Sequence, residues 1–211
     1  GLIEDVKVAG SVTGNNDVAG IVNKIDEDGK IENVAFIGKI NSVGNNSTVG
    51  GIAGSNYMGF VNRAYVDATI TAQNANASML VPFVTYMLNS WKSGTKAKVT
   101  NSVAKGVLDV KNTRNVGGIV AKTWPYGAVQ NNVTYAKVIK GQEIFASNDV
   151  NDEDGGPYIK DLFGVVGYSS AEDGTGKDTK SPNKLKHLTK EEADKRVEGY
   201  NITADTFVSE P

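Results

Sequence analysis

The sequence predicts an all-β fold: a parallel β-helix-like solenoid of about five coils, followed by a short C-terminal helix. Three observations predict it. A ten-residue pattern recurs five times at nearly constant spacing. Short runs of β-branched residues, bounded by Gly and Asn, are typical of strands. Glycine is abundant, with 24 in 211 residues, which indicates many turns in a strand-rich chain.

The repeated pattern aligns without gaps over ten positions, which we call columns one to ten. Its copies are IEDVKVAGSV from Ile3, IENVAFIGKI from Ile31, VNRAYVDATI from Val61, VTNSVAKGVL from Val99 and VQNNVTYAKV from Val129. The copies start 28, 30, 38 and 30 residues apart. One copy cannot bury an apolar face alone, so the copies are expected to stack, roughly 4.8 Å apart.

Three columns hold restricted residue types. Column one is always Ile or Val, and column ten is always Val, Ile or Leu. These two columns should form continuous apolar rows inside the solenoid. Column eight is always Gly or Ala, which predicts a sharp turn or a close approach of two backbones.

A second block follows each copy. Val18–Val22 (VAGIV) recurs as Val49–Ala53 (VGGIA) and Val116–Val120 (VGGIV), with weaker copies at Leu80–Val84 and Leu162–Val166. These blocks should supply further strands of each coil. A β-sandwich is the alternative, but sandwich strands have no reason to repeat in sequence. The density of Gly and β-branched residues disfavours helices.

Two insertions interrupt the repeats, at 85–98 and at about 139–160. Insertions in solenoids go to loops on one face, which is often the binding face. The acidic stretch Asp149–Gly155 is similar to a calcium loop. However, its glycine is one place late, and Lys160 stands where such a loop has its final Glu. A solvated loop is therefore the preferred interpretation.

The predicted organisation is a repeat solenoid over 1–168, a polar linker over 169–188, and a short helix with a connection to a following domain over 189–211. Thr189–Glu192 forms a capping-box pattern that should open the helix, which should end at Gly199. The apolar stripe of this helix consists of Ala193, Val197 and Tyr200.

Composition excludes several classes of partner and chemistry. With 22 basic and 24 acidic residues and no basic stripe, a nucleic-acid partner is not expected. The absence of cysteine excludes disulfides, thiol catalysis and cysteine-ligated zinc. No apolar run reaches the roughly 18 residues of a membrane span, so no membrane insertion is expected. The chain begins with Gly1 rather than Met, and we expect it to be a fragment of a larger protein.

The sequence offers no catalytic constellation and no cofactor or metal site. His187 is the single histidine, so a two-histidine HExxH zinc helix cannot form. We expect His187 to be exposed near the start of the helix. Nucleophile-elbow, phosphate-loop and dinucleotide motifs are also absent. A carbohydrate-cleaving β-helix would need Asp67, Arg63 and Arg114 together, but they fall in different columns.

Large aromatic residues follow the second block in the second, third and fourth copies. These candidate partner-binding residues are Tyr57, Phe60, Tyr86, Trp91, Trp124 and Tyr126. If the coils are in register, the six rings lie along one edge, and exposed aromatic residues are enriched at interfaces. Alternatively, the rings fold back and cover a corner of the coil.

The VGGI blocks and IENV-type starts resemble the glycine-rich (GLUG-like) repeats of streptococcal zinc metalloproteases of the immunoglobulin A1 protease type. Leu188–Arg196 and Asn201–Asp205 are similar to the stretch that joins those repeats to the protease region. The resemblance covers most of the chain. None of the family's zinc ligands, nor its catalytic Glu, maps onto this sequence.

This resemblance implies a non-catalytic domain that holds host immunoglobulin A1 while a separate zinc-dependent domain of the parent cuts it. It implies a zinc metalloendopeptidase parent that is secreted and attached to the cell wall. The expected partners are immunoglobulin A1 and other domains of the parent, and the chain itself is expected to be a monomer. An adhesin-type stalk or host-ligand module without protease activity is the alternative, since adhesins carry similar repeats.

Overall fold

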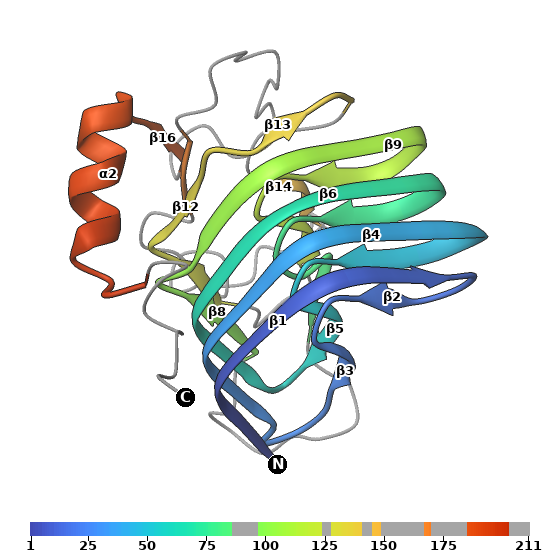
Figure 1. Cartoon of the computed structure of the whole chain (residues 1–211), viewed down its shortest axis with the longest axis horizontal. Helices are drawn as coiled ribbons and strands as arrows, with labels where there is room; N and C mark the ends of the chain where they lie inside the picture. Colours follow the sequence, from blue (N-terminus) through green and yellow to red (C-terminus); the bar gives the residue numbers. More distant parts are fainter. Residues whose placement is uncertain (86–96, 124–127, 141–144, 149–166, 170–184, 203–211) are drawn as a thin grey trace, which may run out of the picture.

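The structure is a computed structural model that describes residues 1–85, 97–123, 128–140, 145–148, 167–169 and 185–202. Its strands form a parallel β-solenoid of about four turns, with a helix beside one face (Figure 1). The predicted fold class is therefore confirmed, with about four turns in place of the predicted five coils. Every described strand pairing is parallel, whereas the alternative β-sandwich would be antiparallel.

The first sheet contains four long strands that lie side by side in Figure 1. They are β1 (Leu2–Gly14), β4 (Lys30–Gly50), β6 (Phe60–Ser78) and β9 (Val103–Gly117). The same sheet includes the shorter strands β2 (Val18–Ala19), β8 (Lys98–Thr100), β11 (Ala128–Gln130), β12 (Asn132–Thr134), β13 (Lys137–Val138), β15 (Gly167–Ser169) and β16 (Leu185–His187). The fifth copy thus contributes short strands to the end of the stack.

The second sheet closes the other side of each coil with short strands. In spatial order they are β14 (Phe145–Asn148), β10 (Val120–Thr123), β7 (Phe83–Thr85), β5 (Ala53–Tyr57) and β3 (Val22–Ile25). The core lies between the two sheets, and a single cluster of buried side chains runs through all the coils.

The register reproduces the sequence columns. In column one, Ile3 pairs with Ile31, Ile31 with Val61, Val61 with Val99, and Val99 with Val129. The last four are buried, and Ile3 is partly buried against the same core. This inward-pointing row confirms the predicted stacking.

Column eight is a point of close backbone approach, as predicted. Gly10 and Gly38 have φ angles of 148° and 147°, values that side-chain-bearing residues rarely adopt. A Cβ on Gly38 would lie 1.9 Å from the carbonyl oxygen of Gly10, and one on Gly106 would lie 2.1 Å from that of Ala68. Gly38 and Gly106 therefore lie where one coil touches the backbone of the coil before it.

The predicted position of the third copy of the second block, Leu80–Val84, is wrong. Val49 pairs with Ala77, and Ala77 with Val116, so the copy is 77–81 and not Leu80–Val84. Ala77 stands where the other copies begin with Val, and no glycine follows it. Register shifts in the neighbouring strands also change the number of residues between the first and the second block. The hydrophobic pattern alone could not show those shifts. The other weak copy, Leu162–Val166, lies outside the described residues.

Part of the predicted insertion at 139–160 belongs to the solenoid. Phe145–Asn148 forms strand β14, in which Phe145 pairs with Val120 of β10. Its residues are not β-branched, which explains why the strand was missed. The acidic stretch Asp149–Gly155 and residues 86–96 of the other insertion lie outside the described part of the chain.

The C-terminal helix begins and ends where the sequence predicts. In α2 (Lys190–Glu198), the Thr189 hydroxyl accepts a hydrogen bond from the Glu192 amide at 3.2 Å. The Glu192 carboxylate accepts one from the Thr189 amide at 2.9 Å, and the helix ends at Gly199. Strand β16, within the predicted linker, pairs with β15, so the first sheet extends into that segment.

The matched glycines of column eight allow a direct test of the stacking. We expect Gly38→Ala to destabilise the fold more than Gly10→Ala, by about 1–3 kcal/mol. Both substitutions place a side chain at nearly the same unfavourable φ angle, so this contribution to the free energy of unfolding is common to the two variants. Only the Cβ at position 38 meets the backbone of another coil. Urea unfolding of both variants measures the difference, and equal free energies of unfolding would contradict the close approach.

Candidate partner-binding surface

Two of the six predicted aromatic residues lie in the described part of the chain. Tyr57 ends β5 and Phe60 begins β6, and both are half-buried. The Lys24 ammonium lies 5.0 Å from the centre of the Tyr57 ring, and the Lys98 ammonium lies 5.3 Å from that of Phe60. Such contacts between a cation and an aromatic ring are attractive, so lysines of other coils hold both rings at this corner.

The corner beneath these rings is fixed by a buried asparagine. Asn56 accepts a hydrogen bond from the Gly59 amide at 2.8 Å and donates to the carbonyls of Gly59 and Lys98, both at 3.1 Å. These bonds tie the turn to the next coil. Tyr86, Trp91, Trp124 and Tyr126 lie outside the described residues, so the row of six rings stays a prediction.

A second surface, missed at the sequence level, follows column three. Its members are Asp5, Asn33, Arg63, Asn101 and Asn131, with φ between 50° and 57°. Asn and Asp adopt this left-handed conformation more readily than other side-chain-bearing residues. The recurrence of Asn and Asp in one column was the sequence signal that could have revealed it.

Hydrogen bonds link the side chains of column three from coil to coil. Asn33 donates to Asp5, Arg63 to Asn33 at 3.3 Å, and Asn131 to Asn101 at 2.6 Å. Asn101 donates sideways to Asn62 of column two, at 2.9 Å. Column three is therefore a polar ladder along one corner of the solenoid.

Helix α2 docks at the end of this ladder. Arg196 donates from Nη1 to the Asn131 side-chain oxygen at 2.8 Å, and the Tyr200 hydroxyl donates to the Asn131 carbonyl. An open cleft of about 590 Å³ lies between the ladder and the helix. We call it the column-three cleft, and its lining residues are Arg63, Asn101, Asn131, Glu192, Lys195, Arg196, Gly199 and Tyr200.

Apolar contacts hold the helix against the outer face of the first sheet. Ala193 is fully buried beside Val133, with Tyr135 and Val197 packed against them. Beyond the helix, Ile202 is buried with side chains from the second, third and fourth copies: Ala35, Tyr65 and Val103. The predicted apolar stripe thus packs on the solenoid, and Figure 1 shows the helix beside the first sheet.

A polar contact completes this packing. The Tyr135 hydroxyl donates to Asp194 at 2.8 Å, and Lys190 forms an ion pair with Asp194 at 2.6 Å. Hydrogen bonds from Lys190 and Tyr135 lower the pKa of the Asp194 carboxyl. Burial, and then the hydrogen bond to Asp194, raise the pKa of Tyr135. At neutral pH the Tyr135 hydroxyl is therefore protonated and the Asp194 carboxyl is ionised, as this hydrogen bond requires.

The described residues contain no group of three or more His, Cys, Asp or Glu side chains that could hold a metal ion. Arg63 and Asp67 lie in columns three and seven of one strand, which keeps them in different columns as predicted. His187 lies in β16, directly before the segment that opens α2. In the portion of the chain that is described, no helix is long and apolar enough to cross a membrane.

Comparison with known proteins finds similarity to two streptococcal zinc metalloproteases. The chain is 52% identical over 176 residues to zinc metalloprotease ZmpB of Streptococcus pneumoniae serotype 4, a match that covers 82% of the chain. It is 32% identical over 160 residues, or 71% of the chain, to zinc metalloprotease ZmpC of the same organism. The chain is thus homologous to a segment of streptococcal zinc metalloproteases. The predicted resemblance is thereby confirmed.

The matched region is a small part of these relatives. It spans 9% of the length of ZmpB and 8% of the length of ZmpC. No family model matches the chain, and no solved structure matches it.

Asp194 makes the docking of α2 sensitive to acid. Its pKa is lower in the folded chain, so the ionised carboxylate stabilises docking above its ordinary pKa of about 3.9, and this stability is lost as pH falls through the folded value. We expect Asp194→Asn to weaken docking by about 1 kcal/mol at neutral pH and to reduce its acid sensitivity.

The measurement is an NMR pH titration that follows the amide resonances of α2 and of Val133. Glu191→Gln is the matched control, because Glu191 is an exposed carboxylate on the same helix. An unchanged titration in Asp194→Asn would show that this carboxylate does not hold the helix.

Proposed function

We propose that this chain is a non-catalytic domain that recognises and positions the substrate of a secreted zinc metalloprotease, and that the substrate is host immunoglobulin A1. The homology to zinc metalloproteases over 82% of the chain carries this proposal. The full sequence has one histidine and no cysteine. The residues present therefore do not fit a zinc centre of the HExxH kind, and zinc is expected in another part of the parent protein.

The architecture suits a positioning role. Cutting one bond in a large folded substrate draws on binding energy from contacts far from the reacting atoms. Those contacts help only if the surface that makes them is held in a fixed geometry. The buried row of column one and the hydrogen-bonded corner at Asn56 provide such rigidity.

Two surfaces on this scaffold are available for contact. The first is the predicted aromatic edge, of which Tyr57 and Phe60 are held at a corner by lysines. The second is the column-three cleft between α2 and the ladder. Secretion and attachment of the parent to the cell wall would place both surfaces where they can meet a host antibody.

Binding to immunoglobulin A1 tests the proposal directly. We expect the isolated chain to bind immunoglobulin A1 in a pull-down and in an NMR titration. Replacing Trp124 and Tyr126 together by Ala should weaken this binding about tenfold or more, because large aromatic residues dominate interface energies. The same variant should still unfold cooperatively.

The control is the double variant Val43→Ala with Ile139→Ala, which removes two exposed apolar side chains outside the aromatic edge. It should bind as the wild type does. A collapse of cooperative melting in the Trp124/Tyr126 variant would place those rings in the packing. Failure of the wild-type chain to bind immunoglobulin A1, with binding to another host ligand, would favour the adhesin-type module.

A further inference from the structure

We propose that the column-three cleft binds carboxylate groups of an acidic peptide segment on a protein partner, with Arg63 as the central contact. This deepens the proposed function by naming a contact surface, and it rests on that function for the identity of the partner. The cleft itself is argued from the conformation of Arg63, its unmatched charge and the cations around it.

The conformation of Arg63 is the first observation. Its φ of 55° is left-handed, as at Asp5, Asn33, Asn101 and Asn131. Those four are the residue types that adopt this conformation most readily, whereas a long side chain there is an outlier. Residues held in disfavoured conformations cluster at functional sites. An arginine at this position of the ladder therefore suggests a functional role that asparagine would not fulfil.

The hydrogen bonding of Arg63 is the second observation. Its Nε is buried and has no hydrogen-bond partner, and its Nη2 makes a long contact of 3.3 Å to Asn33. No ion pair of Arg63 occurs within the described residues. A buried N–H group left without a hydrogen-bond partner is costly. A carboxylate would supply it, because carboxylates match the fork of guanidinium N–H donors.

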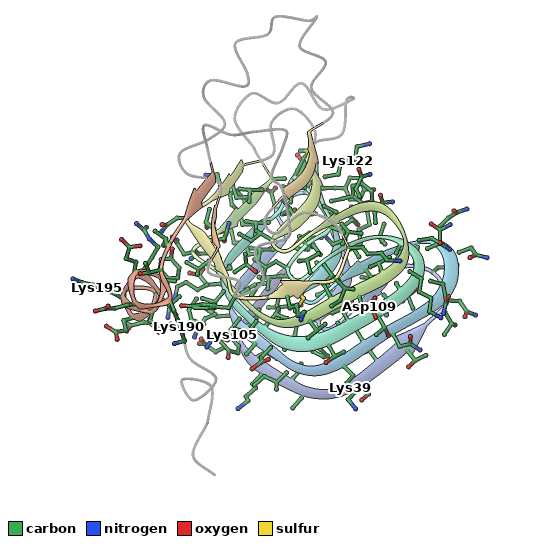
Figure 2. All side chains as sticks on the ribbon, turned by 90° about the horizontal axis from the view of Figure 1, so that it is seen from above. Lys39, Lys105, Asp109, Lys122, Lys190 and Lys195 are labelled. Carbon is green, nitrogen blue, oxygen red and sulfur yellow. The ribbon has the colours of Figure 1, made fainter. Side chains whose placement is uncertain are left out.

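The surroundings of the cleft favour a negative ligand. Arg196 and Lys195 also line it, against one carboxylate, Glu192. That carboxylate already accepts the capping hydrogen bond from the Thr189 amide. Lys195 lines the cleft, and Figure 2 shows it projecting from α2 away from the sheet. The local charge is therefore positive in a chain whose net charge is −2.

The size of the cleft favours a peptide over a single small anion. Its volume of about 590 Å³ exceeds what one carboxylate fills, and it lies in the range of about 300–1,000 Å³ that is typical of ligand clefts. The cations come from two elements, β6 and α2, so neighbouring acidic side chains of one segment could reach both. Docking of α2 on Asn131 completes the site.

Arg63→Asn is the decisive variant. It removes the charge and installs a residue type that tolerates the left-handed conformation, so the thermal midpoint should stay the same or rise. The probe is a short poly-glutamate peptide, with a poly-glutamine peptide of equal length as the uncharged control. We expect poly-glutamate to shift the amide resonances of Asn101, Asn131 and α2, and Arg63→Asn to weaken binding about tenfold.

Lys39→Gln is the charge-matched control, because Lys39 is exposed and lies away from α2 (Figure 2). It should change the affinity by less than about twofold, and added salt should weaken poly-glutamate binding. The proposal is overturned if Arg63→Asn binds poly-glutamate as the wild type does, or if the shifts map outside the cleft. It is also overturned if Arg63→Asn lowers the thermal midpoint, since Arg63 would then be a structural residue.

Binding of immunoglobulin A1 separates this inference from the proposed function. If the wild type binds the antibody and Arg63→Asn binds it equally well, the substrate-recognition role stands and the cleft is not its contact surface. If the wild type does not bind the antibody but binds poly-glutamate through Arg63, the cleft stands and the proposed partner is wrong. Weakened binding of both ligands by Arg63→Asn supports the two together.

Discussion

Parallel stacking of one coil on the next, in strict register, is the constraint on which the rest of this structure depends. Each coil places a β-branched residue of column one over that of its neighbour, and the row from Ile31 to Val129 is removed from water. Burial of such side chains contributes about 1.5–3 kcal/mol each. A slip of one residue would turn these side chains outward. The apolar rows therefore fix both the fold and the position of every surface residue.

The same register that aligns the interior also aligns the corners. At column eight, contact between backbones leaves room for little more than glycine. At column three, the left-handed conformation favours Asn and Asp, whose side chains then hydrogen-bond between coils. Repetition of the sequence thus produces a polar ladder as well as an apolar core. Arg63 is the rung at which the ladder departs from its own pattern.

The helix joins this ladder to the outer face of the first sheet. Apolar contacts of Ala193 and Ile202 provide the packing, while Arg196 and Tyr200 fix the helix on Asn131. A solenoid face alone is a shallow surface. With α2 docked beside the ladder, the face acquires a cleft whose walls come from the solenoid and from the helix.

Sequence by itself determined the solenoid, the inward row, the small column eight and the limits of α2. Each of these depends on local chemistry or on repetition: β-branched side chains, glycine conformations and a capping box are readable in order along the chain. Tertiary structure decided what repetition could not specify. The third copy of the second block lies at 77–81 because register shifts within the long strands before it change the number of residues between the two blocks. Strand β14 forms because a neighbouring strand offers it hydrogen bonds. The cleft exists only because α2 returns to pack on the sheet. Its Arg196 bonds to Asn131, which lies 65 residues earlier in the chain, and no local pattern encodes a contact between such distant segments.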